Sequence, residues 1–418
     1  MPDHASTEAN RGSRLMTRPY LTRRGALLAT GTTAALGLTA CASPDRGPPV
    51  PRDRTGAAQV LGVPNERFLT ATPEGLRAIE AEFVAAGERQ RRRLALRPGA
   101  PAPPLRLLSV SGGGENGAFG AGLLCGWSDL GTRPDFNVVT GVSTGALSAP
   151  FAFLGRDYDP QLRAVYTQLT LADIAESRGL IRAVFDESLA DTTPLFRTIS
   201  RYLDEAMLAA IARAYDDGRL LLIGTTNLDA QVPVIWNVGA IARSGHPRAL
   251  DLVRRILLAS SAMPAIFTPV MIDVTVDGEA MQEMHVDGGA FAQAFLYPSS
   301  VGRARRERIA RGTAARDVEV YVIRNARLDP EWARVERRTL GIAGRAISTM
   351  ISASGFNDVL RIYADTQRDR VGFNLAFIGS DFDKELPAPF DQGFMRALFD
   401  YGYARGRRGY DWAKRPPR

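Results

Sequence analysis

Cysteine is scarce in this sequence of 418 residues. Only Cys41 and Cys125 are present, and no cluster of cysteine and histidine has the spacing of a metal site. We therefore expect neither a metal nor another cofactor. The pattern around Cys41, described below, assigns this residue to lipid attachment, which leaves Cys125 without a partner for a disulfide in the mature chain.

A strong excess of charge of one sign is also missing. The chain has 52 basic and 45 acidic residues, a net charge of +7, and this excess is too small to indicate a nucleic-acid partner. With 45% hydrophobic and 23% charged residues the composition is that of a globular protein. The length allows one large domain or two ordinary ones.

Histidine is rarer still, with three residues in the chain: His4, His246 and His285. The catalytic triad of α/β-hydrolases follows the order serine, acid, histidine. No histidine follows His285, His246 lies in a stretch typical of a surface loop, and His4 belongs to the expected export signal. A triad in the usual order is therefore excluded, and a serine nucleophile in this chain needs a carboxylate as its base.

The N-terminus does carry a recognisable pattern. Thr22-Arg23-Arg24-Gly25 precedes the apolar stretch Ala26 to Leu38, which is too short to span a bilayer comfortably. A basic start, a short apolar middle and small residues before a cleavage site are typical of a secretory signal, and the paired arginines resemble a twin-arginine signal. Leu38-Thr39-Ala40-Cys41 resembles the bacterial lipobox, in which the cysteine becomes the lipidated first residue.

These features predict a domain plan for the N-terminal part. Residues 1–40 would be a removed signal peptide, Cys41 the site of lipidation, and residues 41–58 a flexible tether rich in proline, glycine and arginine. The protein would then be exported and anchored to a membrane, facing the periplasm or the cell exterior. The alternative is a disordered N-terminal tail with a buried Cys41.

The rest of the chain alternates between apolar strands and helices. Residues 59–104 form a helical segment with Thr72 as N-cap and Pro73 in the first turn, and residues 327–418 form a mostly helical extension with one strand-like run at Phe373 to Ile378. Between them, residues 105–326 alternate strand, turn and helix. This pattern predicts an α/β fold with a mainly parallel central sheet and helices on both faces. The predicted strands are Leu105 to Ser111, Val138 to Thr140, Arg219 to Thr226, Val232 to Asn237, Met284 to Asp287 and Val318 to Arg324.

A glycine-rich turn, Gly112-Gly113-Gly114-Glu115-Asn116-Gly117, joins the first of these strands to a helix. A dinucleotide site would require an acid at the end of the second strand, but Asp135 precedes that strand. A glycine-rich turn at a helix N-terminus favours any anion, including the oxyanion formed in acyl transfer. A purely structural turn is the third alternative.

A possible nucleophile follows the second strand in Gly141-Val142-Ser143-Thr144-Gly145. Glycines on both sides of a serine, between a strand and a helix, indicate a sharp turn that presents the hydroxyl. A serine hydroxyl is a weak nucleophile and requires a base.

Asp287 is the best candidate for that base. It ends a strand, and Gly288-Gly289 after it free the backbone to turn. We expect Asp287 and Ser143 at the same edge of the sheet, where partial burial would raise the pKa of the aspartate. An ordinary Asp-Gly-Gly turn is the alternative. His285, two residues earlier, is expected to point to the same face and to serve mainly in packing.

Taken together, the glycine turn, the Ser143 turn and Asp287-Gly288-Gly289 resemble the patatin-like phospholipase family. The segment from Ala259 to Pro269 also resembles the one that precedes the catalytic aspartate in that family. The resemblance implies an α/β fold and acyl-ester hydrolysis on lipids by a Ser–Asp dyad without histidine. By position, Ser143 would be the nucleophile and Asp287 the base. Gly112, Gly113, Gly114 and Gly117 would form the oxyanion loop.

Two residues depart from the family pattern. Ser111 stands where an aspartate often precedes the glycines, and Asn116 stands where an arginine often precedes the last glycine. We therefore expect an exported, lipid-anchored acyl hydrolase whose partner is a lipid or another acyl ester, with an oxyanion loop that depends more on its own backbone. The rival hypothesis is a membrane-tethered lipid-binding protein of the same fold that lacks activity.

Overall fold

The apolar strands of the sequence meet in a single twisted sheet. The computed structural model describes residues 46–97, 100–177, 190–264, 266–312 and 316–417, so the predicted signal peptide and Cys41 lie outside the described residues. The nine strands of this sheet are β1 (Arg67–Leu69), β2 (Leu105–Val110), β3 (Val138–Val142), β6 (Leu220–Asn227), β7 (Val232–Asn237), β8 (Val270–Val276), β9 (Glu279–Asp287), β10 (Val318–Arg324) and β11 (Gly372–Phe377).

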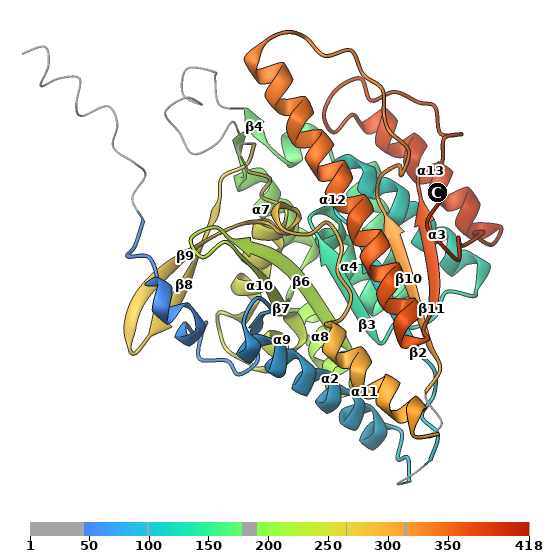
Figure 1. The fold of residues 1–418 in the computed structure, drawn as a ribbon. Helices are drawn as coiled ribbons and strands as arrows, with labels where there is room; N and C mark the ends of the chain where they lie inside the picture. Colours follow the sequence, from blue (N-terminus) through green and yellow to red (C-terminus); the bar gives the residue numbers. More distant parts are fainter. Residues whose placement is uncertain (1–45, 98–99, 178–189, 265, 313–315, 418) are drawn as a thin grey trace, which may run out of the picture. The chain divides into compact units, whose positions relative to one another are not determined.

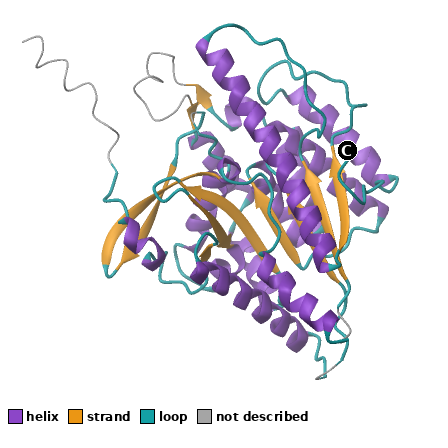
Figure 2. Ribbon diagram, viewed as in Figure 1, coloured by secondary structure: helices purple, strands orange, loops and turns teal. Residues whose placement is uncertain are grey.

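Helices cover both faces of this sheet (Figure 2). The α-helices with described bounds are α2 (Pro73–Arg93), α3 (Gly117–Leu130), α4 (Thr144–Leu154), α5 (Asp159–Thr167), α7 (Thr193–Tyr202), α8 (Glu205–Asp216), α9 (Val238–Arg243), α10 (Ala249–Ser260), α11 (Ser299–Ala310), α12 (Thr339–Asp369) and α13 (Gln392–Arg407). Two short strands, β4 (Glu176–Ser177) and β5 (Ala190–Asp191), pair apart from the main sheet. None of the helices within the described ranges has the length and apolar character needed to cross a bilayer.

Strand order explains how the sheet is built. The strands β6, β3, β2, β10 and β11 lie side by side in this order and run parallel. Antiparallel pairs extend the sheet beyond β6 through β7 and β1, and through β9 and β8. The predicted α/β fold with a mainly parallel sheet and helices on both faces is confirmed.

Alternation along the parallel strands divides the interior into two cores. Leu107, Val138 and Leu222 point to one face, where α2 and α12 cover them, and Leu108, Val139 and Ile223 point to the other. Strands that are buried on both faces read as continuous apolar runs, which is why they were visible in the sequence. In Figure 1, α12 crosses in front of the strands while α3 and α4 lie behind them.

Two parts of the predicted domain plan differ from the structure. The tether predicted for residues 41–58 is not free in its described part, because Arg46 donates to Asp229 at 2.8 and 2.7 Å and Pro49 forms a β-bridge with Gln282 of β9. The segment 327–418 is more than an extension. Its strand β11 completes the sheet beside β10, and α13 packs along α3.

Contact between α3 and α13 depends on glycines of both helices. Gly122 and Gly126 of α3 and Gly402 and Gly406 of α13 repeat at a spacing of four residues, which places each pair on one helix face. A methyl group on Gly402 would clash with the Phe119 carbonyl oxygen, and one on Gly122 would clash with the Phe399 carbonyl oxygen. The two backbones therefore touch directly.

We predict that Gly402→Ala lowers the free energy of unfolding by about 1–3 kcal/mol, because overpacking forces the helices apart. The matched control is Gly87→Ala in α2, where a methyl group would meet no atom within 4 Å. That substitution should raise stability by up to about 1 kcal/mol through helix propensity. Urea denaturation measures both, and equal stabilisation by the two substitutions would rule out close packing of α3 on α13.

Candidate active site

Ser143 occupies the sharp turn that the sequence predicted. It follows β3, caps α4, and adopts φ +56° and ψ −128°, a conformation that a residue with a side chain rarely adopts. A methyl group at Gly141 would lie 2.5 Å from the Gly145 carbonyl oxygen, and one at Gly145 would clash with the Val110 carbonyl oxygen. Both glycines are therefore required for strand and helix to approach each other around the strained serine.

The C-terminal end of α10 and the residue after it hold this turn in place. The Ser143 N–H donates to Ser260 Oγ at 3.1 Å, and Ser260 Oγ donates to the Gly224 carbonyl oxygen at 2.7 Å. Ser261 Oγ lies 3.4 Å from the Ser143 carbonyl oxygen. These serines belong to the Ala259–Pro269 segment of the family resemblance, and their contacts give that segment a physical role in fixing the backbone of Ser143.

Asp287 reaches Ser143 because two strands meet end to end. Strand β3 runs parallel to β6 and ends with Val142 opposite Gly224, and β9 runs antiparallel to β6 and ends with Asp287 opposite Thr225. On its other edge, β6 pairs with β7. Ser143 and Asp287 thus leave their strands at adjacent positions along one edge of β6. The shared location was predicted, but the antiparallel direction of β9 was not.

Burial shapes the electrostatics of this aspartate. Asp287 is 5% exposed, and the Gly289 N–H donates to its Oδ1 at 2.7 Å. Burial raises the pKa of Asp287 to about 6, although hydrogen bonds from the Ser143 side chain and the Gly289 amide oppose the rise. A carboxylate with this pKa is ionised at neutral pH and remains a better proton acceptor than an exposed aspartate.

Neither described histidine contacts this pair. His285 is fully buried, with Nδ1 at 2.9 Å from Thr225 Oγ1 and Nε2 at 3.0 Å from Glu283 Oε2. Burial lowers the pKa of His285, which favours its neutral form and the expected packing role. His246 accepts from the Arg248 N–H in a loop. The described residues contain no group of histidine, cysteine, aspartate and glutamate arranged to hold a metal.

The glycine loop lies beside Ser143, but only part of it is free to bind an oxyanion. The Gly112 N–H donates to the Gln293 carbonyl oxygen at 3.0 Å, and the Gly117 N–H is used in the 3₁₀ turn Gly114–Asn116. The prediction that these two glycines donate to the oxyanion is therefore wrong. Within the described residues, the N–H groups of Gly113 and Gly114 have no acceptor.

Thr144 is a further donor that sequence reasoning missed. It is the first residue of α4, where a helix leaves the N–H without an intrahelical partner. The residue after the nucleophile supplies such a donor in α/β-hydrolases, so its position next to Ser143 was the available signal. Its backbone and hydroxyl are fixed by Tyr166, whose hydroxyl lies 2.6 Å from Thr144 Oγ1 and donates to the Thr144 carbonyl oxygen at 2.8 Å.

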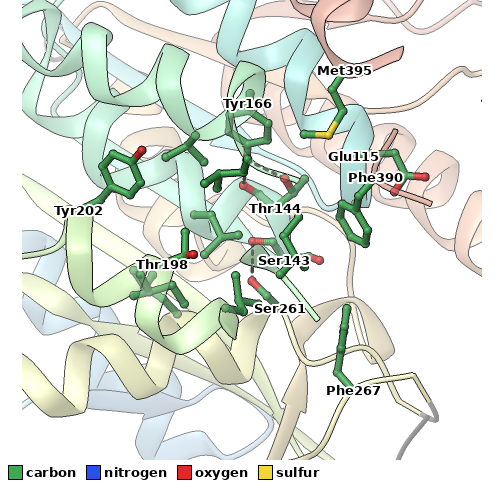
Figure 3. Close-up of a pocket in the computed structure, with 18 of the residues that line it drawn as sticks. Glu115, Ser143, Thr144, Tyr166, Thr198, Tyr202, Ser261, Phe267, Phe390 and Met395 are labelled. Carbon is green, nitrogen blue, oxygen red and sulfur yellow. Dashed lines mark hydrogen bonds between the residues drawn. The ribbon is translucent and has the colours of Figure 1, made fainter. Parts of the chain in front are cut away.

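An apolar cavity of about 390 Å³ opens beside Ser143 (Figure 3). Its walls come from several helices and from the segment before α13, and include Leu147, Phe151, Ile199, Leu257, Phe390 and Met395. Glu115, within the glycine loop, also lines the cavity, and burial raises its pKa. The cavity is suited to a hydrocarbon chain whose polar end lies at Ser143.

The central part of the chain matches a known protein family. The family model described as Patatin-like phospholipase matches residues 108–296. These residues form a patatin-like phospholipase domain. The match includes the glycine loop, Ser143 and Asp287, and the family supports lipid acyl hydrolase activity in general. Among curated proteins, no sequence matches the chain.

Two solved structures resemble the chain more distantly. VipD from Legionella pneumophila has 13% sequence identity and a TM-score of 0.37, over 74% of this chain and 67% of VipD. Human GIVD cytosolic phospholipase A2 has 10% identity and a TM-score of 0.24, over 77% of this chain and 52% of that protein.

We predict that Asp287→Asn stabilises the protein at neutral pH. The folded pKa of about 6 exceeds the ordinary value of 3.8. The folded state therefore favours the protonated carboxyl, and its stability falls as the pH rises through about 6. The neutral amide avoids this loss, which at about 1.4 kcal/mol per pKa unit amounts to about 3 kcal/mol at most.

Denaturant titrations of both proteins at pH 8 and pH 4.5 measure this effect. The asparagine variant should be more stable than the native protein at pH 8, and the difference should shrink toward pH 4.5 because the aspartate is then protonated in the folded state. A variant that is less stable at pH 8 would show that the buried carboxylate is not a source of instability.

Proposed function

We propose that the protein is a serine acyl hydrolase that cleaves carboxylic esters of lipids through a Ser143–Asp287 dyad. The observation that carries the proposal is the convergence of three features at one place. The strained serine, the buried aspartate with its pKa of about 6, and the mouth of an apolar cavity all lie at the junction of β3 and β9.

In the first half of the reaction, Ser143 Oγ attacks the ester carbonyl carbon while Asp287 accepts the hydroxyl proton. The negative charge that develops on the carbonyl oxygen is stabilised by the free N–H groups of Gly113, Gly114 and Thr144. Collapse of the tetrahedral intermediate breaks the ester bond. The departing alcohol oxygen takes the proton from Asp287, and the acyl group remains on Ser143.

In the second half, Asp287 accepts a proton from water as the water oxygen attacks the acyl carbon. The same N–H groups stabilise the second oxyanion. When this intermediate collapses, Ser143 Oγ takes the proton back from Asp287 and the fatty acid is released. A single carboxylate can act in both halves because its raised pKa lets it accept and return a proton near neutral pH.

The cavity supports a lipid substrate in place of a small polar ester. Its lining is mostly aliphatic and aromatic, and Ser143 lies at its wall (Figure 3). An acyl chain in the cavity would place its carbonyl group beside Ser143. We also propose that export and lipidation at Cys41 hold the enzyme at a membrane, which is where its substrates are found. This part of the proposal rests on the sequence pattern alone.

We predict that Ser143→Ala lowers kcat on a p-nitrophenyl ester by about 10⁴-fold or more, because within the described residues Ser143 is the side-chain hydroxyl that hydrogen-bonds the Asp287 carboxylate. Labelling by a fluorophosphonate probe should be lost as well. Release of fatty acid from phospholipid vesicles tests the lipid substrate directly, and circular dichroism checks that the variant is folded.

Two outcomes would contradict this function. Undiminished turnover by folded Ser143→Ala would exclude Ser143 as the nucleophile. Vesicle binding by a native protein that neither reacts with the probe nor releases fatty acid would favour the lipid-binding hypothesis.

We predict that Cys41→Ser shifts the protein from the membrane fraction to the soluble fraction or leaves an uncut precursor, because the substituted chain offers no thiol for lipidation. Cell fractionation and mass spectrometry of the mature protein measure the result. Native protein that retains unmodified residues 1–40 would contradict export and lipidation.

A further inference from the structure

The glycine loop is anchored by residues that lie beyond the matched domain. Ser111 Oγ accepts from the Asn325 N–H at 2.9 Å and donates to the Gly112 carbonyl oxygen at 2.7 Å. Asn325 Nδ2 donates to the Ser111 carbonyl oxygen at 3.0 Å, and Asn325 Oδ1 accepts from the Gly120 N–H at 3.1 Å. The residue that follows β10 thus ties the loop to both β2 and α3.

Arg324, the last residue of β10, adds a positive charge to this anchor. Its side chain is buried, with 2% exposure, and Nη1 donates to Ser111 Oγ and to the Gly112 carbonyl oxygen, both at 3.3 Å. Nε has no hydrogen-bond partner within the described structure, and none of the ion pairs there includes Arg324. Burial lowers the pKa of Arg324 to about 10, so the guanidinium stays charged at neutral pH.

Peptide geometry links this contact to the oxyanion donors. In a planar trans peptide, the C=O of one residue and the N–H of the next point in opposite directions. Because Arg324 holds the Gly112 carbonyl oxygen, the Gly113 N–H must point away from Arg324. Gly113 has φ +154°, and a methyl group there would clash with the Asn325 carbonyl oxygen, so the loop has little freedom to turn over.

We propose that Arg324 is a positioning residue for ester hydrolysis. It holds the Gly112 carbonyl so that the Gly113 N–H faces the oxyanion, and it lends the loop a fixed positive charge. The proposal rests on the serine hydrolase function stated above. It also accounts for both departures from the family pattern. Ser111 is a neutral partner that adds no negative charge beside the guanidinium, and Asn116 brings no charge of its own to the loop.

Helix α12 holds Arg324 from the other side. Gly355 lies directly against the guanidinium, so that a methyl group there would clash with it. Asp358, one turn later, is the acid whose charge raises the pKa of Arg324, opposing the larger effect of burial. The same Asp358 accepts from the Gln293 N–H at 2.7 Å, and the Gln293 carbonyl oxygen accepts from the Gly112 N–H. Helix α12 therefore completes the support of the loop.

Substitutions of Arg324 test the positioning role on a p-nitrophenyl ester. Arg324→Met removes the charge and both hydrogen bonds, and kcat should fall by about 10²-fold, the loss typical of one oxyanion donor, with KM unchanged. Arg324→Lys keeps the charge and should recover part of that loss. The rate of fluorophosphonate labelling should fall in parallel with kcat. The acid limb of the pH–rate profile, near pH 6, should not move, because it reports Asp287.

A matched pair of substitutions in α12 tests the same idea without changing Arg324. Gly355→Ala should displace the guanidinium and lower kcat by about 10-fold or more, within the loss expected for a weakened oxyanion donor. Gly344 lies in the same helix, and a methyl group there would meet no atom within 4 Å. The kcat of Gly344→Ala should therefore equal that of the native protein. This pair decides the question if Arg324→Met fails to fold.

The outcomes separate this inference from the proposed function. If Ser143→Ala is inactive while folded Arg324→Met or Gly355→Ala keeps the native kcat, the hydrolase stands and the role of Arg324 is refuted. A change confined to KM would also refute it, since an oxyanion donor acts in the transition state. If Ser143→Ala itself keeps full activity, the proposed function fails first.

Discussion

The site depends on one constraint: strand β6 offers a single edge to two strands that approach from opposite directions. Strand β3 ends opposite Gly224 and β9 ends opposite Thr225, so the two chains must both leave the sheet at this junction. Close packing leaves little room for their turns. A methyl group at Gly288 would lie 2.5 Å from the Gly224 carbonyl oxygen. A methyl group at Gly141 would lie equally close to the Gly145 carbonyl oxygen. The junction therefore requires the glycines of both motifs, and it brings Ser143 and Asp287 close together.

Two unfavourable features are concentrated at the junction. Ser143 is held at φ +56°, which costs about 1–3 kcal/mol for a residue with a side chain. Asp287 is buried, and no cationic side chain contributes to the shift of its pKa. Neither feature would persist in an isolated turn. They persist here because Ser260, the Gly289 amide and the sheet register fix the backbone on all sides.

The sequence was informative where one short segment determines the structure. Thr72 caps α2 as predicted, with the Gly75 N–H 3.0 Å from its Oγ1, and the buried strands stood out as apolar runs. Of the β8–β9 hairpin, only the end of β9 was predicted. Its turn, Asp277-Gly278 with positive φ values, is a typical two-residue turn between strands in which apolar and polar residues alternate. The pairing of the Gly112 N–H could not be predicted, since its acceptor, the Gln293 carbonyl oxygen, comes from a distant segment of the chain.

Arg324 shows why a motif alone does not define such a site. A single arginine at the end of a strand has no local signature, and its significance arises only when the sheet brings β10 beside β2. A loop that lacks a basic residue of its own can still be held by a positive charge from a neighbouring strand, provided that the charge is buried and its other side is supported. Here the support comes from Gly355 and Asp358 of α12, and the cavity wall is completed by Phe390 and Met395. The C-terminal segment is therefore part of the same structural unit as Ser143 and Asp287.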